Sequence, residues 1–110
     1  MTYKSISDML DEAKIPTAYH HFDEGYAPDP PFICFFYPES NDFIADDTNY
    51  QHVEHLVIEL YTDNKDFNAE KAVRDVLNSH GLIYARSEDY IATERLYEVV
   101  FETDVIITEE

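Results

Sequence analysis

Residues 31–37 read PFICFFY, a proline followed by six apolar or aromatic residues. This composition predicts a β-strand. A strand with one wet face normally alternates apolar and polar residues, whereas this one places apolar side chains on both faces. The segment therefore predicts a strand that is buried on both sides, and it raises the question of what covers the second side.

Further strands are predicted on both sides of this segment. Residues 52–62 (HVEHLVIELYT) are rich in branched and aromatic side chains. Residues 95–108 (RLYEVVFETDVIIT) alternate apolar side chains on one face with mostly acidic ones on the other. Shorter candidate strands cover residues 18–22 and 82–86. The chain therefore offers enough strands for a sheet of four or five.

Two segments have the period of a helix. In the first, Ile6, Met9 and Leu10 recur at helical spacing, and Ser5 and Asp8 have the spacing of a capping box. We therefore expect a short amphipathic helix near the N-terminus.

The second helical segment carries an apolar stripe between residues 69 and 80. Asp66 is placed to cap its N-terminus, and Gly81 is placed to end it. The expected order of elements is therefore helix, three strands, helix, two strands.

This order predicts an α+β fold: a mainly antiparallel four- to five-stranded sheet with two helices packed on one face. The 110 residues are expected to form a single domain, in which residues 39–49 are an acidic and mobile loop. Two short helices with one apolar stripe each can cover only one side of the sheet. We therefore expect another subunit to cover the second side of residues 31–37.

The charge of the chain restricts its partners. Twenty-four acidic residues oppose seven basic ones, and the basic residues are scattered singly. Sequence-specific nucleic-acid binding and binding to an anionic membrane are therefore not expected, because both need clustered lysine or arginine. The sequence also lacks an apolar run long enough for a membrane span. With Cys34 as its one cysteine, the chain is expected in a reducing cytoplasm.

The sequence does not predict an enzyme. With two glycines, neither a phosphate-binding loop nor a dinucleotide fingerprint can be written. His20 and His21 are adjacent, and adjacent side chains of a strand point to opposite faces, so they are not expected to share a metal ion. We therefore expect no catalytic residues, no metal ligands and no cofactor.

The nine tyrosines and seven phenylalanines exceed what one core of this size needs. Tyrosine is enriched at protein interfaces because its ring is apolar and its hydroxyl tolerates water. The acidic loop also carries apolar side chains that could anchor it to another protein. The candidate contact residues are Phe43, Ile44, Asp46, Asp47, Tyr50 and Tyr61.

Three runs of this sequence resemble a known family: PPFICFFYPESNDFIADD, ELYTDNKD and ERLYEVVFE. Over about residues 3–105 the chain is similar to small tail proteins of siphoviruses and prophages of Gram-positive bacteria. These are tail-terminator or tail-completion proteins, which serve in head–tail joining. The resemblance supplies no catalytic residues.

The resemblance implies a structural protein that forms an oligomeric ring, usually a hexamer. The ring would stop growth of the tail tube and join the tube to the head. Its partners would be copies of itself, the major tail protein and the head-connector protein. It would be assembled in the cytoplasm of the bacterial host and would lie in the neck of the virion.

A second hypothesis follows from the net charge of −17 alone. A monomeric acidic binding module could imitate the charge of DNA, as anti-defence proteins do. The surplus of aromatic residues and the doubly apolar strand favour the ring. The two hypotheses predict different masses in solution.

Overall fold

A computed structural model of the chain describes residues 1–45 and 48–108, without the side chains of residues 44–50. It contains two helices and six strands. In chain order they are α1 (Tyr3–Asp11), β1 (Thr17–Tyr19), β2 (Phe32–Ser40), β3 (Phe43–Ala45), β4 (Thr48–Thr62), α2 (Phe67–Ser79), β5 (Ala85–Ile91) and β6 (Leu96–Ile107).

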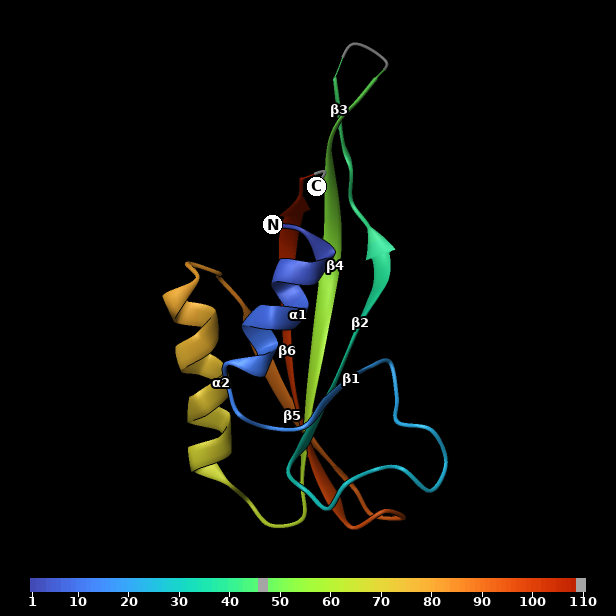
Figure 1. Ribbon diagram of the computed structural model, residues 1–110, viewed down its shortest axis with the longest axis vertical. Helices are drawn as coiled ribbons and strands as arrows, with labels where there is room; N and C mark the ends of the chain where they lie inside the picture. Colours follow the sequence, from blue (N-terminus) through green and yellow to red (C-terminus); the bar gives the residue numbers. More distant parts are fainter. Residues whose placement is uncertain (46–47, 109–110) are drawn as a thin grey trace.

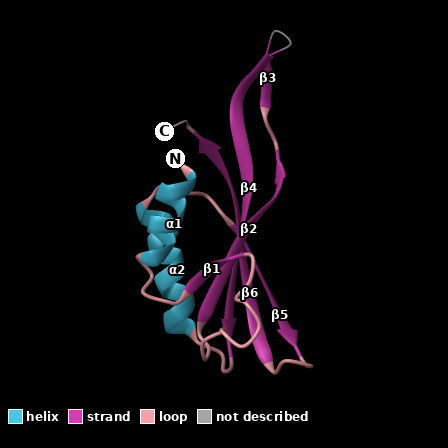
Figure 2. Cartoon of the chain, turned by 45° about the vertical axis from the view of Figure 1, so that its right-hand side comes forward, coloured by secondary structure: helices cyan, strands magenta, loops and turns pink. Residues whose placement is uncertain are grey.

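The strands form one twisted sheet in the order β1-β2-β4-β6-β5, and β3 pairs separately with β4 (Figure 1). Neighbouring strands are antiparallel except β1 and β2, which are parallel. Both helices lie on the same side of the sheet (Figure 2). The predicted α+β class, with a mainly antiparallel sheet and helices on one face, is confirmed.

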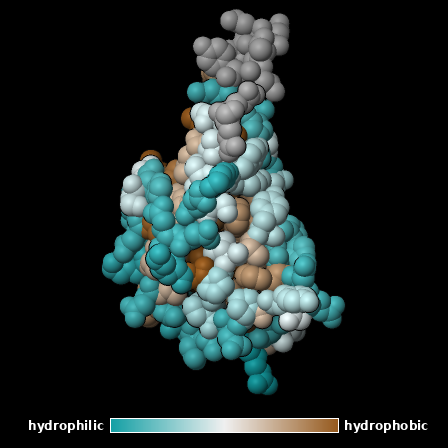
Figure 3. Space-filling view, viewed as in Figure 1, coloured by the Kyte–Doolittle hydropathy of each residue, from teal (hydrophilic) through white to brown (hydrophobic). Residues whose placement is uncertain are grey.

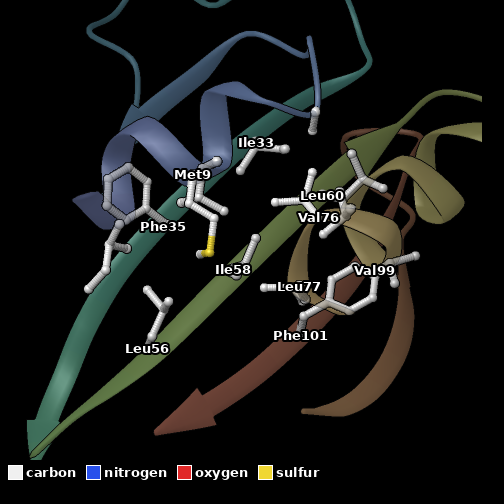
Figure 4. Close-up of a cluster of buried hydrophobic side chains, with 14 of the residues drawn as sticks. Met9, Ile33, Phe35, Leu56, Ile58, Leu60, Val76, Leu77, Val99 and Phe101 are labelled. Carbon is white, nitrogen blue, oxygen red and sulfur yellow. The ribbon is translucent and has the colours of Figure 1, made fainter. Parts of the chain in front are cut away.

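The core lies between the helices and one face of the sheet (Figure 4). Alternate residues of β4 (Leu56, Ile58 and Leu60) point into it, and all three are fully buried. Met9 of α1 and Phe101 of β6 pack in the same cluster. The apolar side chains that alternate along the strands therefore pack against the apolar stripes of α1 and α2 in one layer.

The cap predicted for the first helix was wrong by one turn. Thr2 is the N-cap: its hydroxyl accepts from the backbone N–H of Ser5 at 3.0 Å, and the Ser5 hydroxyl accepts from the N–H of Thr2 at 2.9 Å. Ser5 therefore occupies the N3 position of the capping box, whereas it was expected at the N-cap position. The helix begins at Tyr3, so this residue joins the helix surface.

The ends predicted for the second helix are confirmed. The Asp66 carboxylate accepts from the N–H of Ala69 at 3.0 Å. Gly81 has a φ of +72°, a conformation that glycine adopts without steric cost, directly after the C-cap residue His80.

Residues 39–49 were expected to form an acidic, mobile loop, and the expectation of a loop was wrong for most of the residues that the structure describes there. β2 continues to Ser40, β3 follows, and β4 begins at Thr48. The segment instead folds back on itself as a β-hairpin, because β3 pairs in antiparallel register with β4. Asp46 and Asp47 lie outside the described residues.

The surface is mostly hydrophilic on the side shown in Figure 3, where apolar residues appear as separate small patches.

None of the helices in the described chain is long and apolar enough to cross a membrane.

Candidate assembly interface

The face of the sheet that points away from the helices is called the rear face below. Because side chains alternate along a strand, Phe32, Cys34 and Phe36 of β2 point to it, while Ile33 and Phe35 enter the core. These rear-face residues are the second apolar side that the sequence analysis left uncovered.

Part of that side is covered by the chain itself. The connector between β1 and β2, residues 20–31, packs aromatic rings against the strand. The Phe22 and Phe32 rings meet edge to face at 5.6 Å, and the His20 ring lies 5.5 Å from that of Phe36. Cys34 between them is only 5% exposed. We call this arrangement the connector clasp.

The expectation that another subunit covers this strand was therefore wrong for its first half. The reason lies in the topology: β1 and β2 are parallel, so the connector has to cross back along the sheet. It crosses on the rear face, where its aromatic residues meet those of β2. The chain itself therefore covers part of the second apolar side of β2, and Phe32 and Phe36 stay half-buried.

A cavity of about 460 Å³ lies beneath the connector clasp, between it and Cys34, Tyr61 and Leu96. Burial, followed by the nearby charge of Glu59, raises the pKa of the Cys34 thiol to about 11. The thiol is therefore protonated at neutral pH and lacks the thiolate that nucleophilic chemistry requires.

The expectation that His20 and His21 point apart was also wrong. β1 ends at Tyr19, and His20 has a φ of +66°, so the two histidines do not continue the strand. Their Nδ1 atoms lie 3.0 Å apart. Within the described part of the chain, no group of three or more metal-binding side chains comes together.

The rear face beside the connector clasp carries acidic side chains. The Tyr61 hydroxyl donates to Glu98 at 2.8 Å, and Glu59 shares a hydrogen bond with the same carboxylate. Burial raises the pKa of Glu59 to about 7, with hydrogen bonding to Glu98 and its charge as the next causes. Glu59 therefore holds a proton close to neutral pH, which lets two carboxyl groups lie together.

His55 lies between the next two acidic side chains along the rear face. Its Nδ1 lies 2.9 Å from Asp104 and its Nε2 lies 3.0 Å from Glu102. Hydrogen bonds to Glu102 and then to Asp104 raise the pKa of the imidazole. His52 points to the opposite face of β4, as its odd spacing from His55 predicted, and its Nδ1 lies 2.7 Å from Asp42.

The proton on Glu59 makes stability depend on pH. Its folded pKa of about 7 lies above the ordinary value of 4.5, so the folded chain holds this proton more tightly than the unfolded chain does. The contribution of this proton to stability is therefore fully present below about pH 4.5 and is lost as the pH rises through 7. In Glu59→Gln, the free energy of unfolding should fall by about 1 kcal/mol less over this pH range than in the unchanged chain. This value is discounted for the exposed part of the carboxyl group.

Urea unfolding at about pH 5 and about pH 8 measures this difference for both proteins. Glu24→Gln, at an exposed position of the connector, serves as the control and should keep the pH dependence of the unchanged chain. An equal pH dependence in Glu59→Gln and the unchanged chain would contradict the assignment.

The second feature of interest is the hairpin of Phe43–Ala45 and Thr48–Gln51, called the β3–β4 hairpin. In the described chain, residues 48–51 of β4 pair with β3 alone, since pairing with β6 begins at His52. The hairpin projects beyond both helices and the other strands (Figure 1). It gives the molecule a length of 49 Å against 28 and 24 Å across.

The structure separates the six predicted contact residues. Phe43 lies on the β3–β4 hairpin and is 56% exposed. Ile44 and Tyr50 belong to the two hairpin strands, and Asp46 and Asp47 lie outside the described residues. Tyr61 lies on the rear face about ten residues further along β4, or roughly 33 Å away. Tyr61 therefore does not share a surface with Phe43.

Two features of these surfaces were missed from the sequence. The connector clasp depends on the parallel pairing of β1 with β2, and the Glu59–Glu98 pair depends on the register of β4 with β6. The sequence signal that could have predicted the clasp is the pair formed by the doubly apolar residues 31–37 and the aromatic Phe22 in the connector before them. Comparison with models of protein families and with curated proteins gave no match to this chain.

Proposed function

We propose that this chain is a structural protein of the phage neck, which forms an oligomeric ring, caps the tail tube and joins it to the head connector. The family resemblance of the sequence leads to this proposal. The observation that carries it is the β3–β4 hairpin, which extends from the body of the molecule with an exposed aromatic residue.

A two-stranded hairpin is marginally stable in water by itself. This one lies beyond the helices, and Phe43, which is 56% exposed, gains free energy when another surface removes its exposed part from water. Docking onto a neighbouring subunit or onto the tail tube supplies that surface. The hairpin is thus suited to assembly and has no evident use in an isolated monomer.

A ring is built from heterologous contacts, in which one patch meets a different patch on the next copy. The hairpin supplies one patch. The outer edge of β5 supplies a second, because β5 ends the sheet order and pairs on its other side with β6. Backbone groups along such an edge can pair with a strand of another chain.

Charge sets the conditions for assembly. Each copy carries a formal charge of −17, so neighbouring copies repel one another. Salt screens this repulsion over distances of about 10 Å at 0.1 M. We therefore expect the ring to become more stable as the salt concentration rises.

The test is the mass in solution, measured by light scattering over a range of protein and salt concentrations. The unchanged chain should form a species several times the mass of the monomer, and this species should increase with salt. Phe43→Asp should shift the population toward the monomer by about tenfold or more, because it removes an apolar anchor and adds a charge. Tyr26→Asp, which makes the same kind of change at a 79% exposed aromatic residue of the connector, is the matched control.

A ring that dissociates as salt is raised, or a Phe43→Asp protein that assembles like the unchanged chain, would contradict the proposal. A monomer under all conditions would favour the acidic binding module. A negative ring should also leave passing DNA unbound, so tight DNA binding at low salt would contradict the proposed role as well.

A further inference from the structure

A cavity of about 420 Å³ lies on the helix side of the sheet, away from the surfaces described above. Four elements far apart in the sequence meet there: α1, β1, β2 and β4. Four of its five lining residues are aromatic, and the fifth is a glutamate. They are Tyr3, Tyr19, Phe35, Tyr37 and Glu54. We call it the tyrosine pocket.

The aromatic rings of the tyrosine pocket stand at several angles to one another. Tyr3 and Tyr37 meet at 5.4 Å and 76°, and Tyr19 meets Phe35 at 5.4 Å and 88°. The Tyr19 and Tyr37 rings lie 5.9 Å apart at 34°. Because the face of an aromatic ring carries negative potential, a group of rings in different orientations attracts a cation from several sides.

The glutamate adds a formal charge to these rings. Glu54 is only 9% exposed, and its carboxylate accepts from the Tyr3 hydroxyl at 3.1 Å and from the Ser40 hydroxyl. These donors are neutral, so they hold the carboxylate in place without cancelling its charge. His52 lies near it, with its Nε2 3.7 Å from Glu54 and its Nδ1 already bonded to Asp42.

The third observation is the Tyr37 hydroxyl. It is buried and has no hydrogen-bond partner within the described part of the chain. Tyr37 lines the pocket, and burial, followed by the nearby Tyr19, Tyr3 and Glu54, raises the pKa of its hydroxyl. A buried polar group without a partner is unusual in a folded protein and calls for a water or a ligand group beside it. A tetraalkylammonium head group forms no hydrogen bond, so this partner has to be a water or another part of the ligand, such as the hydroxyl of choline.

We propose that the tyrosine pocket binds an alkylated ammonium group, carried either by a small molecule such as choline or by a methylated lysine side chain. Several aromatic faces and a fixed carboxylate are the combination that recognises this chemistry. An anion would be repelled by Glu54, and a purely apolar ligand would remove the charge of Glu54 from water without compensation. The site is separate from the proposed ring and does not depend on it.

The binding test uses the full chain at constant ionic strength, with the tyrosine ring resonances followed by NMR. Choline and a neutral peptide containing one trimethyllysine are titrated separately, so that the stronger of the two identifies the source of the ammonium group. The uncharged isostere 3,3-dimethylbutanol serves as the comparison. At least one of the two cations should bind saturably, and about tenfold or more tightly than the isostere.

Two variants distinguish the pocket from general attraction to an acidic protein. Tyr19→Ala removes one ring at an exposed position and should weaken binding of the cation about tenfold. Glu54→Gln keeps the shape of the side chain and should remove most of the preference for the cation over its isostere. Tyr90→Ala, which removes a tyrosine of similar exposure on β5, should leave the affinity unchanged.

No saturable shift with either cation at about 100 mM would overturn the proposal, since even weak specific sites bind in the millimolar range. Equal affinities for the cations and the isostere would also overturn it, as would an effect of Tyr90→Ala equal to that of Tyr19→Ala.

Discussion

Phe101→Ala is expected to destabilise the fold by about 3–5 kcal/mol. Phe101 is fully buried at the centre of β6, where it lies opposite Ile58 of β4 and 5.6 Å from the Tyr84 ring. Truncation loses the transfer free energy of the ring and leaves a cavity between the sheet and α2. Domains of this size are stable by only about 5–15 kcal/mol, so the loss is a large fraction of the total.

Urea unfolding followed by far-ultraviolet circular dichroism measures this loss, and Ile83→Ala is the control. Ile83 is 92% exposed, so its truncation should change stability by less than about 0.5 kcal/mol. A loss below about 1 kcal/mol in Phe101→Ala would mean that β6 does not pack against the helices as described.

The second large effect is expected from Arg86→Met, at about 2–3 kcal/mol. Glu70 of α2 is only 5% exposed, and Nη2 of Arg86 lies 2.6 Å from its carboxylate. Lys65 contacts the other oxygen. Removing Arg86 leaves a buried carboxylate with one cation in place of two, and it removes the direct ion pair between β5 and α2.

Lys71→Met tests whether this effect depends on burial. Lys71 also pairs with a carboxylate, that of Asp75 at 2.6 Å, but both side chains are exposed. Exposed pairs one helical turn apart contribute about 0.3–0.5 kcal/mol, so Lys71→Met should be nearly neutral. Equal losses in the two variants, measured by urea unfolding, would show that Glu70 is not the reason for the effect.

The strongly patterned parts of the chain were predictable. The acidic and apolar alternation of β6 and the stripe of α2 specify both the type of each element and the face that it buries, and the structure confirms them. Leu56, Ile58 and Leu60 of β4 likewise share the buried face that their spacing predicted. In these segments the local pattern and the tertiary contacts agree.

β5 shows why other parts were not predictable. A strand was expected at residues 82–86, whereas β5 runs from Ala85 to Ile91 and reads ARSEDYI. Such a charged segment has little intrinsic preference for a strand. It forms one because β6 offers an edge to pair with and because Arg86 is held by Glu70. Both contacts depend on residues distant in the sequence.

The candidate contact residues were predicted from the surplus of aromatic residues. A surplus in composition does not indicate where in the fold these residues lie. Phe43 and Tyr61 looked alike as surplus aromatic residues, yet Phe43 lies on β3, which pairs with the first residues of β4, and Tyr61 lies near the other end of β4. The tyrosine pocket joins Tyr3 to Tyr19 and Tyr37 across three elements, and only the fold brings these side chains together. The sequence supplied the surplus of tyrosines without indicating where they gather.

The continuity of β4 determines how a partner bound to the hairpin is positioned relative to the rest of the molecule. The strand runs without a break from the projecting hairpin to the middle of the sheet, between β2 and β6. A slip by one residue would turn Leu56, Ile58 and Leu60 out of the core, so the strand cannot slide past its neighbours. The strands of the hairpin therefore cannot slide relative to the sheet, and a partner bound to them is held at a fixed position along the body.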